Sequence, residues 1–513
     1  MKRERWGSRL GVIMAVAGSA IGLGNFLRFP VQAVKNGGGA FMIPYFISLF
    51  LLGIPLMWIE WTIGRFGGGF GHGTAPGIFH SMWEKNKFIK YFGVIGIFGP
   101  LVIFVYYTYI ESWLLAYGIF SLLGKYKTCI DEKTMTAFLQ GYQGIIKNQY
   151  FTSILPAYIF FLITFVANIF IVYYGIKKGI ENVCKYALPI LFIFGLVIMI
   201  RVLTFQPIFD KNWSSLNGLG FLWNPNFSAL KSAKVWLSAA GQIFFTLSVG
   251  IGVILTYASY LTKDKDVLLS GLTAASANEI AEVIIGGSIV IPAAFIFFGP
   301  TGIQNIAQQG AFNISFVTMP LVLKTFPYGE FFGFLWFSLL FLAGITSSIS
   351  LEQPIITFLE DEFNLSREKS IFIFGIVSFL LCNYSIFFLN KGVVDELDFW
   401  GGTFALVLFA TVETILFGWI FGIDKAWEEM HSGSDITLPK FYKFIIKYIT
   451  PIFLLFILGF WTFQEAIPTL FLKGIKKENL SFIILTRIIL FLLFSILCIL
   501  VKKAWTKRAK ESS

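Results

Sequence analysis

Long apolar segments separated by short polar stretches dominate the chain. Windows of roughly 20 mainly apolar residues, the length with which a helix crosses a bilayer, recur about twelve times. They lie near 9–35, 39–66, 88–123, 155–174, 183–204, 232–261, 269–298, 329–358, 370–389, 395–421, 441–466 and 479–502. The pattern predicts an all-α polytopic membrane protein whose residues 1–513 form a single transmembrane domain.

The first apolar segment carries polar and helix-weakening residues where a plain membrane helix is expected. Glycines at 18, 22 and 24 weaken helix continuity, and Asn25 and Arg28 bring polar and charged groups to membrane depth. Gly18 and Gly22 alone would fit close helix packing. Together with Asn25 and Arg28, they predict a broken helix whose freed carbonyls coordinate a small cation and whose half-helix N-terminus faces an anion.

The sixth segment repeats this feature. Gln242, Thr246 and Ser248 precede Gly250 and Gly252 in the middle of an otherwise apolar run. The first and sixth segments are the same member of two five-segment halves, 9–204 and 232–421, followed by two additional helices over 441–502. Interrupted helices at matching places predict a transporter site between two inverted repeats.

Other polar groups at membrane depth are candidates for the same site. Thr346 and Ser347, beside Ala343, offer oxygen ligands, although single Ser and Thr residues more often bond to the preceding turn. Asn278 and Glu282 lie together in the seventh segment, where buried acids are costly unless they are used.

Several further side chains allow two interpretations each. Glu60 and Glu111 are isolated acids that could share a proton or cap an unwound backbone, and a structural role is as plausible as a functional one. Ion pairs of Arg28 with Asp398 at the outer opening, and of Arg3 with Asp361 at the inner end, are geometrically conceivable. Each of these charges alone would more often be a solvated end group.

Composition and charge support the membrane assignment. The chain is 56% hydrophobic and 13% charged, far below the charge content of soluble domains, which is about 25%. Lysines and arginines flank the first and last segments, which places both termini in the cytoplasm of a multi-pass plasma-membrane protein. The net charge of +11 therefore suits the inner membrane surface rather than nucleic acid.

Motifs for ATP hydrolysis, nucleophilic catalysis and dinucleotide binding do not occur in the sequence. The three histidines all lie near predicted inner loops, so a histidine proton relay is not expected. We therefore expect no enzyme and no ATP-driven pump, but a transporter that uses an ion gradient.

Three runs of residues carry a resemblance to a known family. They are Gly18–Pro30 (GSAIGLGNFLRFP), Asn36–Tyr45 (NGGGAFMIPY) and the stretch from Gly53 through Glu60 to Arg65. They resemble the neurotransmitter:sodium symporter family, particularly its bacterial leucine-transporting members, and the resemblance extends through all the segments. It implies sodium-coupled symport of a small hydrophobic L-amino acid into the cell by alternating access.

The resemblance also implies the ligands of two sodium ions and one substrate. The first sodium would take Ala20, Asn25, Thr246, Asn278 and the substrate carboxylate; the second would take Gly18, Ile21, Ala343, Thr346 and Ser347. The substrate would contact Ala20, Leu23, Gly24, Ile103, Tyr107, Phe245, Thr246, Ser248, Ile251, Ser347 and Leu351. Arg28 with Asp398 would gate the outer side, and Arg3 with Asp361 the inner side.

Two residues bear on specificity within this resemblance. Gly24 stands where amine-transporting relatives carry an aspartate, which suits a substrate that brings its own carboxylate. Glu282 stands where chloride-dependent relatives carry a serine, so its carboxylate can replace the ion. The alternatives are a transporter-like amino-acid sensor and, less in keeping with a shared carboxylate, a sodium channel. Whether the protein is a monomer or a homodimer stays open.

Overall fold

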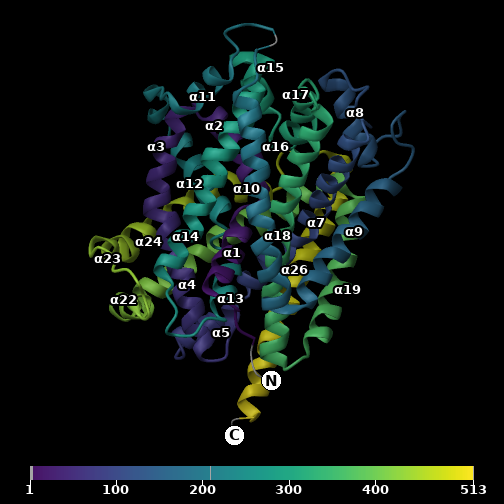
Figure 1. Ribbon diagram of the computed structural model, residues 1–513. Coiled ribbons are helices and arrows are strands. Elements are labelled where there is room, and N and C mark those ends of the chain that lie inside the picture. The colour runs from purple at the N-terminus through teal and green to yellow at the C-terminus, as the bar shows by residue number, and fades with distance from the viewer. Residues whose placement is uncertain (1–3, 208, 512–513) are drawn as a thin grey trace.

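The computed structural model describes residues 4–207 and 209–511, and the regular elements of these ranges are all helical. Figure 1 shows an upright bundle in which the described chain begins and ends at the same, lower end. Ten helical stretches are long and apolar enough to cross a membrane. They are Gly39–Gly69, Ile89–Leu122, Leu155–Tyr173, Ile176–Leu203, Leu268–Gln308, Gly329–Phe363, Arg367–Phe387, Val393–Ile420, Phe441–Leu470 and Lys477–Arg508. The all-α polytopic fold is confirmed.

The first predicted span is broken, as its glycines and polar residues indicate. Helix α1 (Arg9–Ala20) ends where Ile21 leaves helical geometry, with φ −73° and ψ 85°. The chain resumes as a π-helical turn, Gly24–Arg28, and continues into α2 (Phe29–Lys35). The two parts form an angle of 43°, and counting them as one span brings the total to eleven.

The sixth predicted span, 232–261, does not form one helix of spanning length. Helix α12 (Ala233–Leu247) contains 15 residues and α13 (Val253–Ala258) contains six. Between them Ser248, Gly250 and Gly252 all have positive φ, a region that L-residues with a side chain rarely enter. The expected break is therefore present. It divides the segment into two helices that are each too short to be counted among the ten spanning stretches.

Two segments between the predicted spans, 124–154 and 300–328, contain helices. Helix α8 (Glu132–Tyr142) lies within 124–154, where Asp131 caps it by accepting the Thr134 N–H at 2.8 Å. The seventh span does not stop near 298, because α15 (Gly287–Gln308) bends at Gly299 and continues for two more turns. The short helix α17 (Met319–Leu323) then completes a helical hairpin over 300–328.

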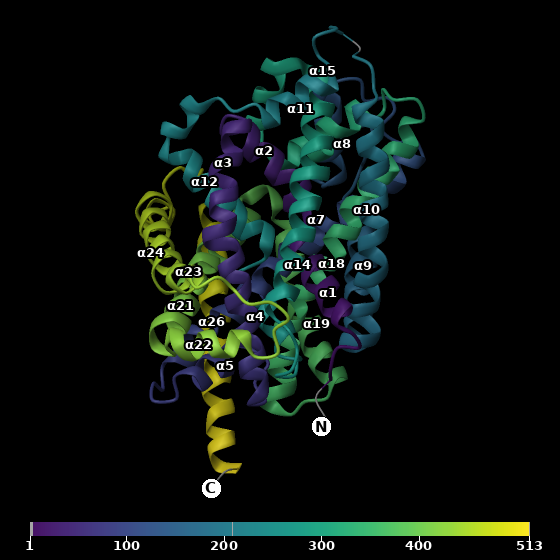
Figure 2. The ribbon, with the colours of Figure 1, turned by 60° about the vertical axis from the view of Figure 1, so that its left-hand side comes forward.

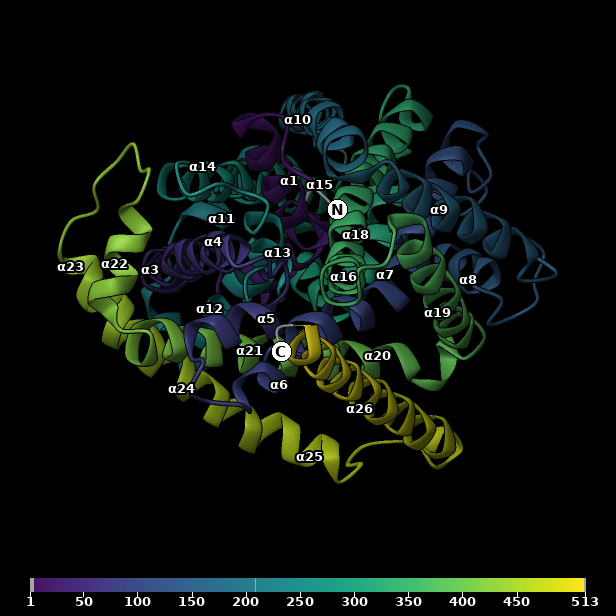
Figure 3. The same cartoon turned by 90° about the horizontal axis from the view of Figure 1, so that it is seen from below.

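The helices form a buried centre and a lipid-exposed rim. Helix α18 (Gly329–Phe363) packs along α7 (Ile95–Leu122) and also touches α1 and α10 (Asn182–Leu203). Seen from below in Figure 3, α1, α7, α13 and α18 lie centrally, whereas α26 (Leu480–Glu511) lies on the rim. The most apolar window of Ile89–Leu122 is 89% buried, and that of Lys477–Arg508 is 22% buried. Both helix breaks therefore lie in the buried centre.

Candidate functional site: two helix breaks and their oxygen clusters

The first break leaves backbone oxygens exposed to the interior of the bundle. Because α1 ends at Ala20, the carbonyls of Gly18, Ser19 and Ala20 receive no backbone N–H from a following turn. The Asn25 Oδ1 atom accepts the Gly22 N–H at 2.9 Å and so caps the interrupted backbone. Asn25 is fully buried, which makes it part of the protein interior rather than a solvated polar residue.

Four residues predicted at the first sodium site lie together beside this break. The Asn25 Nδ2 atom donates to Asn278 Oδ1 at 2.7 Å and to Thr246 Oγ1 at 3.2 Å. The Asn278 Oδ1 atom also lies 3.2 Å from the Ala20 carbonyl oxygen and 3.0 Å from the Thr246 carbonyl oxygen. Oxygens that face one another repel unless the amide turns its NH₂ toward the carbonyls or a cation lies between them.

Four of the five residues predicted at the second sodium site also gather. The Ser347 Oγ atom lies 3.3 Å from Gly18 O and 3.0 Å from Ala343 O. The Thr346 Oγ1 atom lies 3.2 Å from Ala343 O, and Thr346 Cβ would be 3.1 Å from a Cβ placed on Gly18. The fifth residue, Ile21, has the non-helical ψ that frees its carbonyl. A hard monovalent cation would find the oxygen ligands it prefers here.

The second break is stabilised by hydrogen bonds to residues of other helices. The Gly250 N–H donates to Glu60 Oε1 at 2.5 Å, and Glu60 is fully buried on α4 (Ile54–Gly69). The Ser248 hydroxyl donates to the Ser19 carbonyl oxygen at 2.8 Å, which ties the two breaks together. Capping an unwound backbone, one of the two roles that the sequence left open for Glu60, is therefore observed.

The predicted substrate residues surround the two breaks. The Leu23 N–H donates to Tyr107 Oη at 3.4 Å, and a Cβ placed on Gly22 would be 3.3 Å from Tyr107 Oη and 2.9 Å from Ser347 Oγ. By contrast, a Cβ on Gly24 would meet no atom within 4 Å, so this glycine faces open space.

The positions of the residues predicted to line the substrate pocket follow from helical spacing and from the second break. Ile103 lies one turn before Tyr107 on α7, and Leu351 lies one turn after Ser347 on α18, so each shares a face with a residue of the cluster. Ile251 lies within the second break, and Phe245 is on the last turn of α12.

The predicted outer ion pair is not formed. Among the described residues, Arg28 and Asp398 are not within ion-pair distance of each other. The Arg28 guanidinium lies 3.6 Å from the Phe245 ring centroid and donates to the Gly241 carbonyl at 3.3 Å. Asp398 instead accepts the Tyr106 hydroxyl at 2.5 Å. Matching opposite charges along the sequence could not reveal that Phe245, Gly241 and Tyr106 bind these two side chains instead.

The predicted inner pair cannot be placed in full, because Arg3 lies outside the described residues. Asp361 is the third-last residue of α18. Near it the Trp6 Nε1–H donates to the Tyr257 carbonyl at 2.9 Å, and the Tyr260 hydroxyl lies 2.8 Å from Thr357 Oγ1.

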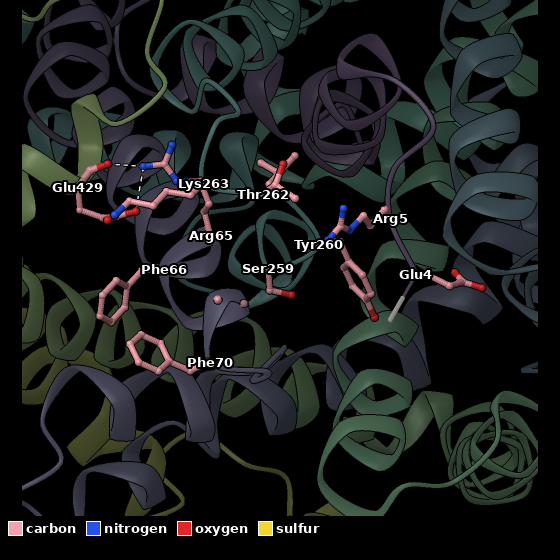
Figure 4. Close-up of a pocket in the computed structure, with 13 residues that line it drawn as sticks. Glu4, Arg5, Arg65, Phe66, Phe70, Ser259, Tyr260, Thr262, Lys263 and Glu429 are labelled. Atoms are coloured by element: carbon pink, nitrogen blue, oxygen red, sulfur yellow. Dashed lines mark hydrogen bonds and ion pairs between the residues drawn. The ribbon is translucent and has the colours of Figure 1, made fainter. Parts of the chain in front are cut away.

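Sequence analysis missed a cavity of about 520 Å³ at this end of the bundle, which Figure 4 shows. Its walls come from the N-terminal segment, the end of α4, residues 259–263 and Glu429 of α22 (Ile423–His431). Arg65 pairs with Glu429 at 3.0 Å across it. These residues are far apart in the sequence, so no local pattern signals the cavity.

Glu282 has a polar side chain beside each of its carboxyl oxygens. Its Oε1 accepts the Tyr45 hydroxyl at 3.0 Å and the Gln242 Nε2–H at 3.0 Å, and its Oε2 accepts the Thr246 hydroxyl. Three side-chain donors thus surround one fully buried carboxyl beside Thr246, which also belongs to the first oxygen cluster, and the Tyr45 hydroxyl is shared with Glu279 Oε2 at 2.8 Å.

The bundle is similar to known sodium-dependent transporters over nearly its whole length. It shares 31% identity over 468 residues with an uncharacterised sodium-dependent transporter of Methanocaldococcus jannaschii, covering 88% of this chain and 89% of the relative. A second such transporter, from Haemophilus influenzae, is 30% identical over 89% of this chain and 97% of its own.

A solved structure and a family model agree with these relatives. The crystal structure of MhsT in complex with L-phenylalanine matches with a TM-score of 0.75 and 29% identity, covering 89% of this chain and 99% of that one. The model of the sodium:neurotransmitter symporter family matches residues 3–501. This family comprises secondary transporters rather than enzymes, and the chain, a multi-pass membrane protein, belongs to the sodium:neurotransmitter symporter family.

Proposed function

We propose that this chain is a symporter that carries a hydrophobic L-amino acid together with two sodium ions. The observation that carries the proposal is the cluster of oxygens from Ala20, Thr246 and Asn278, joined by the Asn25 amide, next to the open space at Gly24. A substrate carboxylate placed in that space completes the coordination of the first ion. The ion and the substrate then bind as a unit, which is the physical basis of coupling.

The residues around the open space set the chemistry of the substrate. Backbone N–H groups at the start of the helix after the break, with the Tyr107 hydroxyl, hold the carboxylate. The carbonyls of Ala20 and Phe245 and the hydroxyl of Ser248 hold the ammonium group. Ile103, Ile251 and Leu351 leave only apolar surface for the side chain, so an aliphatic or aromatic amino acid fits. MhsT, with its bound L-phenylalanine, supports this class.

The second ion binds between the two halves of the molecule. Gly18 and Ile21 belong to the first repeat, 9–204, and Ala343, Thr346 and Ser347 belong to the second, 232–421. An ion that ligates both repeats holds them in one relative orientation, and its release allows the repeats to rock. With both termini in the cytoplasm, release on that side delivers the amino acid into the cell.

Glu282 makes transport independent of chloride. Its carboxylate supplies, next to the first sodium ion, the negative charge that chloride would otherwise bring. The test is uptake of radiolabelled amino acid into proteoliposomes in chloride and in gluconate, for the wild type and Glu282→Ser. We expect equal wild-type rates in the two salts and a variant that is active only with chloride. A chloride-dependent wild type would contradict the assignment.

A further inference from the structure

A second carboxyl cluster lies beside the proposed second sodium site, and no step described so far uses it. Gly344, Ser348 and Glu352 follow one another at intervals of four residues, so they share one face of α18. Glu111 of α7 faces them: a Cβ placed on Gly344 would be 3.1 Å from Glu111 Cγ. Glu111, Ser348 and Glu352 are all fully buried.

A chain of hydrogen bonds joins Glu111 to Ser348, the residue next to Ser347 of the proposed second sodium site. The Ser348 hydroxyl donates to Asn168 Oδ1 at 2.6 Å, and the Asn168 Nδ2 atom donates to Glu111 Oε2 at 3.2 Å and Oε1 at 3.3 Å. Ser348 directly follows Ser347, whose hydroxyl touches the carbonyls of the proposed second site. Two hydrogen-bonded side chains, Asn168 and Ser348, thus connect Glu111 to the helical turn that carries Ser347.

Glu352 differs from Glu111 in lacking any such support. Both of its carboxyl oxygens are buried and have no hydrogen-bond partner among the described residues. A buried carboxylate without donors is costly, and a second carboxylate nearby raises the cost because like charges repel. Glu111 receives the Asn168 amide N–H and Glu352 receives no donor among the described residues, so Glu352 is the carboxyl that gains more from holding a proton.

Few other charged or titratable groups face Glu352. From α19 (Arg367–Phe387), Arg367 attracts a carboxylate there and Cys382 is a neutral thiol; from α13, Tyr257 is a neutral hydroxyl. Arg367 already donates to Gln353 Oε1 at 3.1 Å and to the Val172 carbonyl at 2.7 Å. These contacts lead from the neighbourhood of Glu352 to the end of α18 at which both described ends of the chain lie (Figure 1).

We propose that Glu111 and Glu352 form a proton-binding site that loses its proton when sodium binds beside Ser347. The inference rests on the second sodium site of the proposed function. A positive charge at that site stabilises the carboxylate form of both residues, so the Glu352 O–H bond breaks and the proton passes to water. When sodium leaves, Glu352 regains a proton. Proton and sodium therefore compete, and low pH weakens sodium binding.

The test is proton release by the purified protein in weakly buffered solution with a pH-indicator dye. Sodium chloride, but not potassium chloride, should release protons from the wild type without any amino acid present. Apparent sodium affinity should fall by up to about tenfold per unit decrease in pH where one proton is exchanged for one ion. In Glu352→Gln the release should vanish and sodium affinity should no longer depend on pH.

Two variants and one variant-free measurement separate the explanations. Glu465→Gln removes an exposed glutamate and should behave as the wild type. If Glu282→Gln abolishes the release and Glu352→Gln does not, the proton belongs to Glu282 and the proposal is overturned.

If Glu352→Gln does not fold, infrared difference spectra of the wild type decide. Addition of sodium should decrease the absorbance of a protonated-carboxyl band, and an unchanged band overturns the proposal. Absence of proton release with intact sodium-driven uptake refutes this inference alone, whereas absence of uptake refutes the proposed function.

Discussion

The two helix breaks of this transporter solve the same backbone problem in different ways. The first break is short and is capped within its own chain segment, where Asn25 accepts the Gly22 N–H three residues away. The second contains three residues with positive φ and depends on Glu60, 190 residues away, for its Gly250 N–H. Figure 2 shows the surrounding helices from a second side, with α1 beside α18, which it contacts.

The difference indicates a division of labour. In the first break the N–H groups are partly satisfied locally, which leaves the carbonyls of Gly18, Ala20 and Ile21 available to the proposed sodium ions. In the second break the strained conformation persists because the neighbouring helix over-determines it. We therefore expect substitutions at the second break to damage the fold, and substitutions at the first to damage ion and substrate binding.

The largest effect should come from Gly252→Ala. Its Cβ would lie 2.4 Å from the Gly96 carbonyl oxygen and 2.8 Å from Gly96 Cα, and φ is +92°. Backbone cannot yield as a flexible side chain would, so the variant should lose most of its folded, monodisperse fraction in size-exclusion chromatography. Gly24→Ala is the matched control, because its Cβ meets nothing; it should fold normally and lose substrate affinity. If the folded fractions of the two variants were equal, the second break would be no more important for the fold than the first.

Removal of the Glu60 carboxylate should come next. Glu60→Leu leaves the buried Gly250 N–H without an acceptor, at a cost of about 1–3 kcal/mol. Glu60→Gln keeps an acceptor oxygen and should retain part of the activity. Thermal unfolding midpoints and uptake rates of the two variants check this order. A leucine variant as stable and active as the glutamine variant would show that the second break needs no outside cap.

At the first break, Asn25→Ala should affect sodium more than the fold. The variant loses an amide that contacts Thr246 and Asn278, and the sodium concentration for half-maximal uptake should rise about tenfold, equivalent to about 1.4 kcal/mol. The variant also leaves the Gly22 N–H without its side-chain acceptor, so the thermal midpoint without sodium should fall, but by less than in Glu60→Leu. Unchanged sodium dependence would separate Asn25 from the ion site.

The smallest effect should come from Arg28→Lys at the outer side. Lysine keeps the charge but loses the planar group that stacks on Phe245, an interaction of about 0.5–2 kcal/mol. Uptake should fall only a few-fold. Asp398→Asn should behave similarly, since Asp398 bonds to Tyr106 rather than to Arg28. A complete loss in either variant would mean that the pair closes during the transport cycle.

Local sequence patterns predicted the two helix breaks, but they could not predict the contacts between residues that are far apart in the sequence. The glycines and polar residues at 18–28 and 242–252 violate the apolar pattern of a membrane helix, and both breaks follow from that violation. The partner of Gly250 could not be predicted, because any of several buried acids could have capped it. The pairing of Arg28 with Asp398 was a wrong expectation for this conformation, since a guanidinium also binds aromatic faces and carbonyls. The cavity beside Arg65 could not be predicted either, because its walls come from four separate chain segments.

Sodium-driven accumulation in proteoliposomes tests the central claim most directly. Purified protein would be given labelled leucine, alanine, methionine, phenylalanine or tryptophan, with an inward sodium gradient or with an equal potassium gradient. A sodium-coupled symporter accumulates at least one of these above the external concentration, only with the sodium gradient, and the accumulation collapses when the gradient is dissipated. Sodium-dependent binding without accumulation would contradict coupled transport and favour an amino-acid sensor.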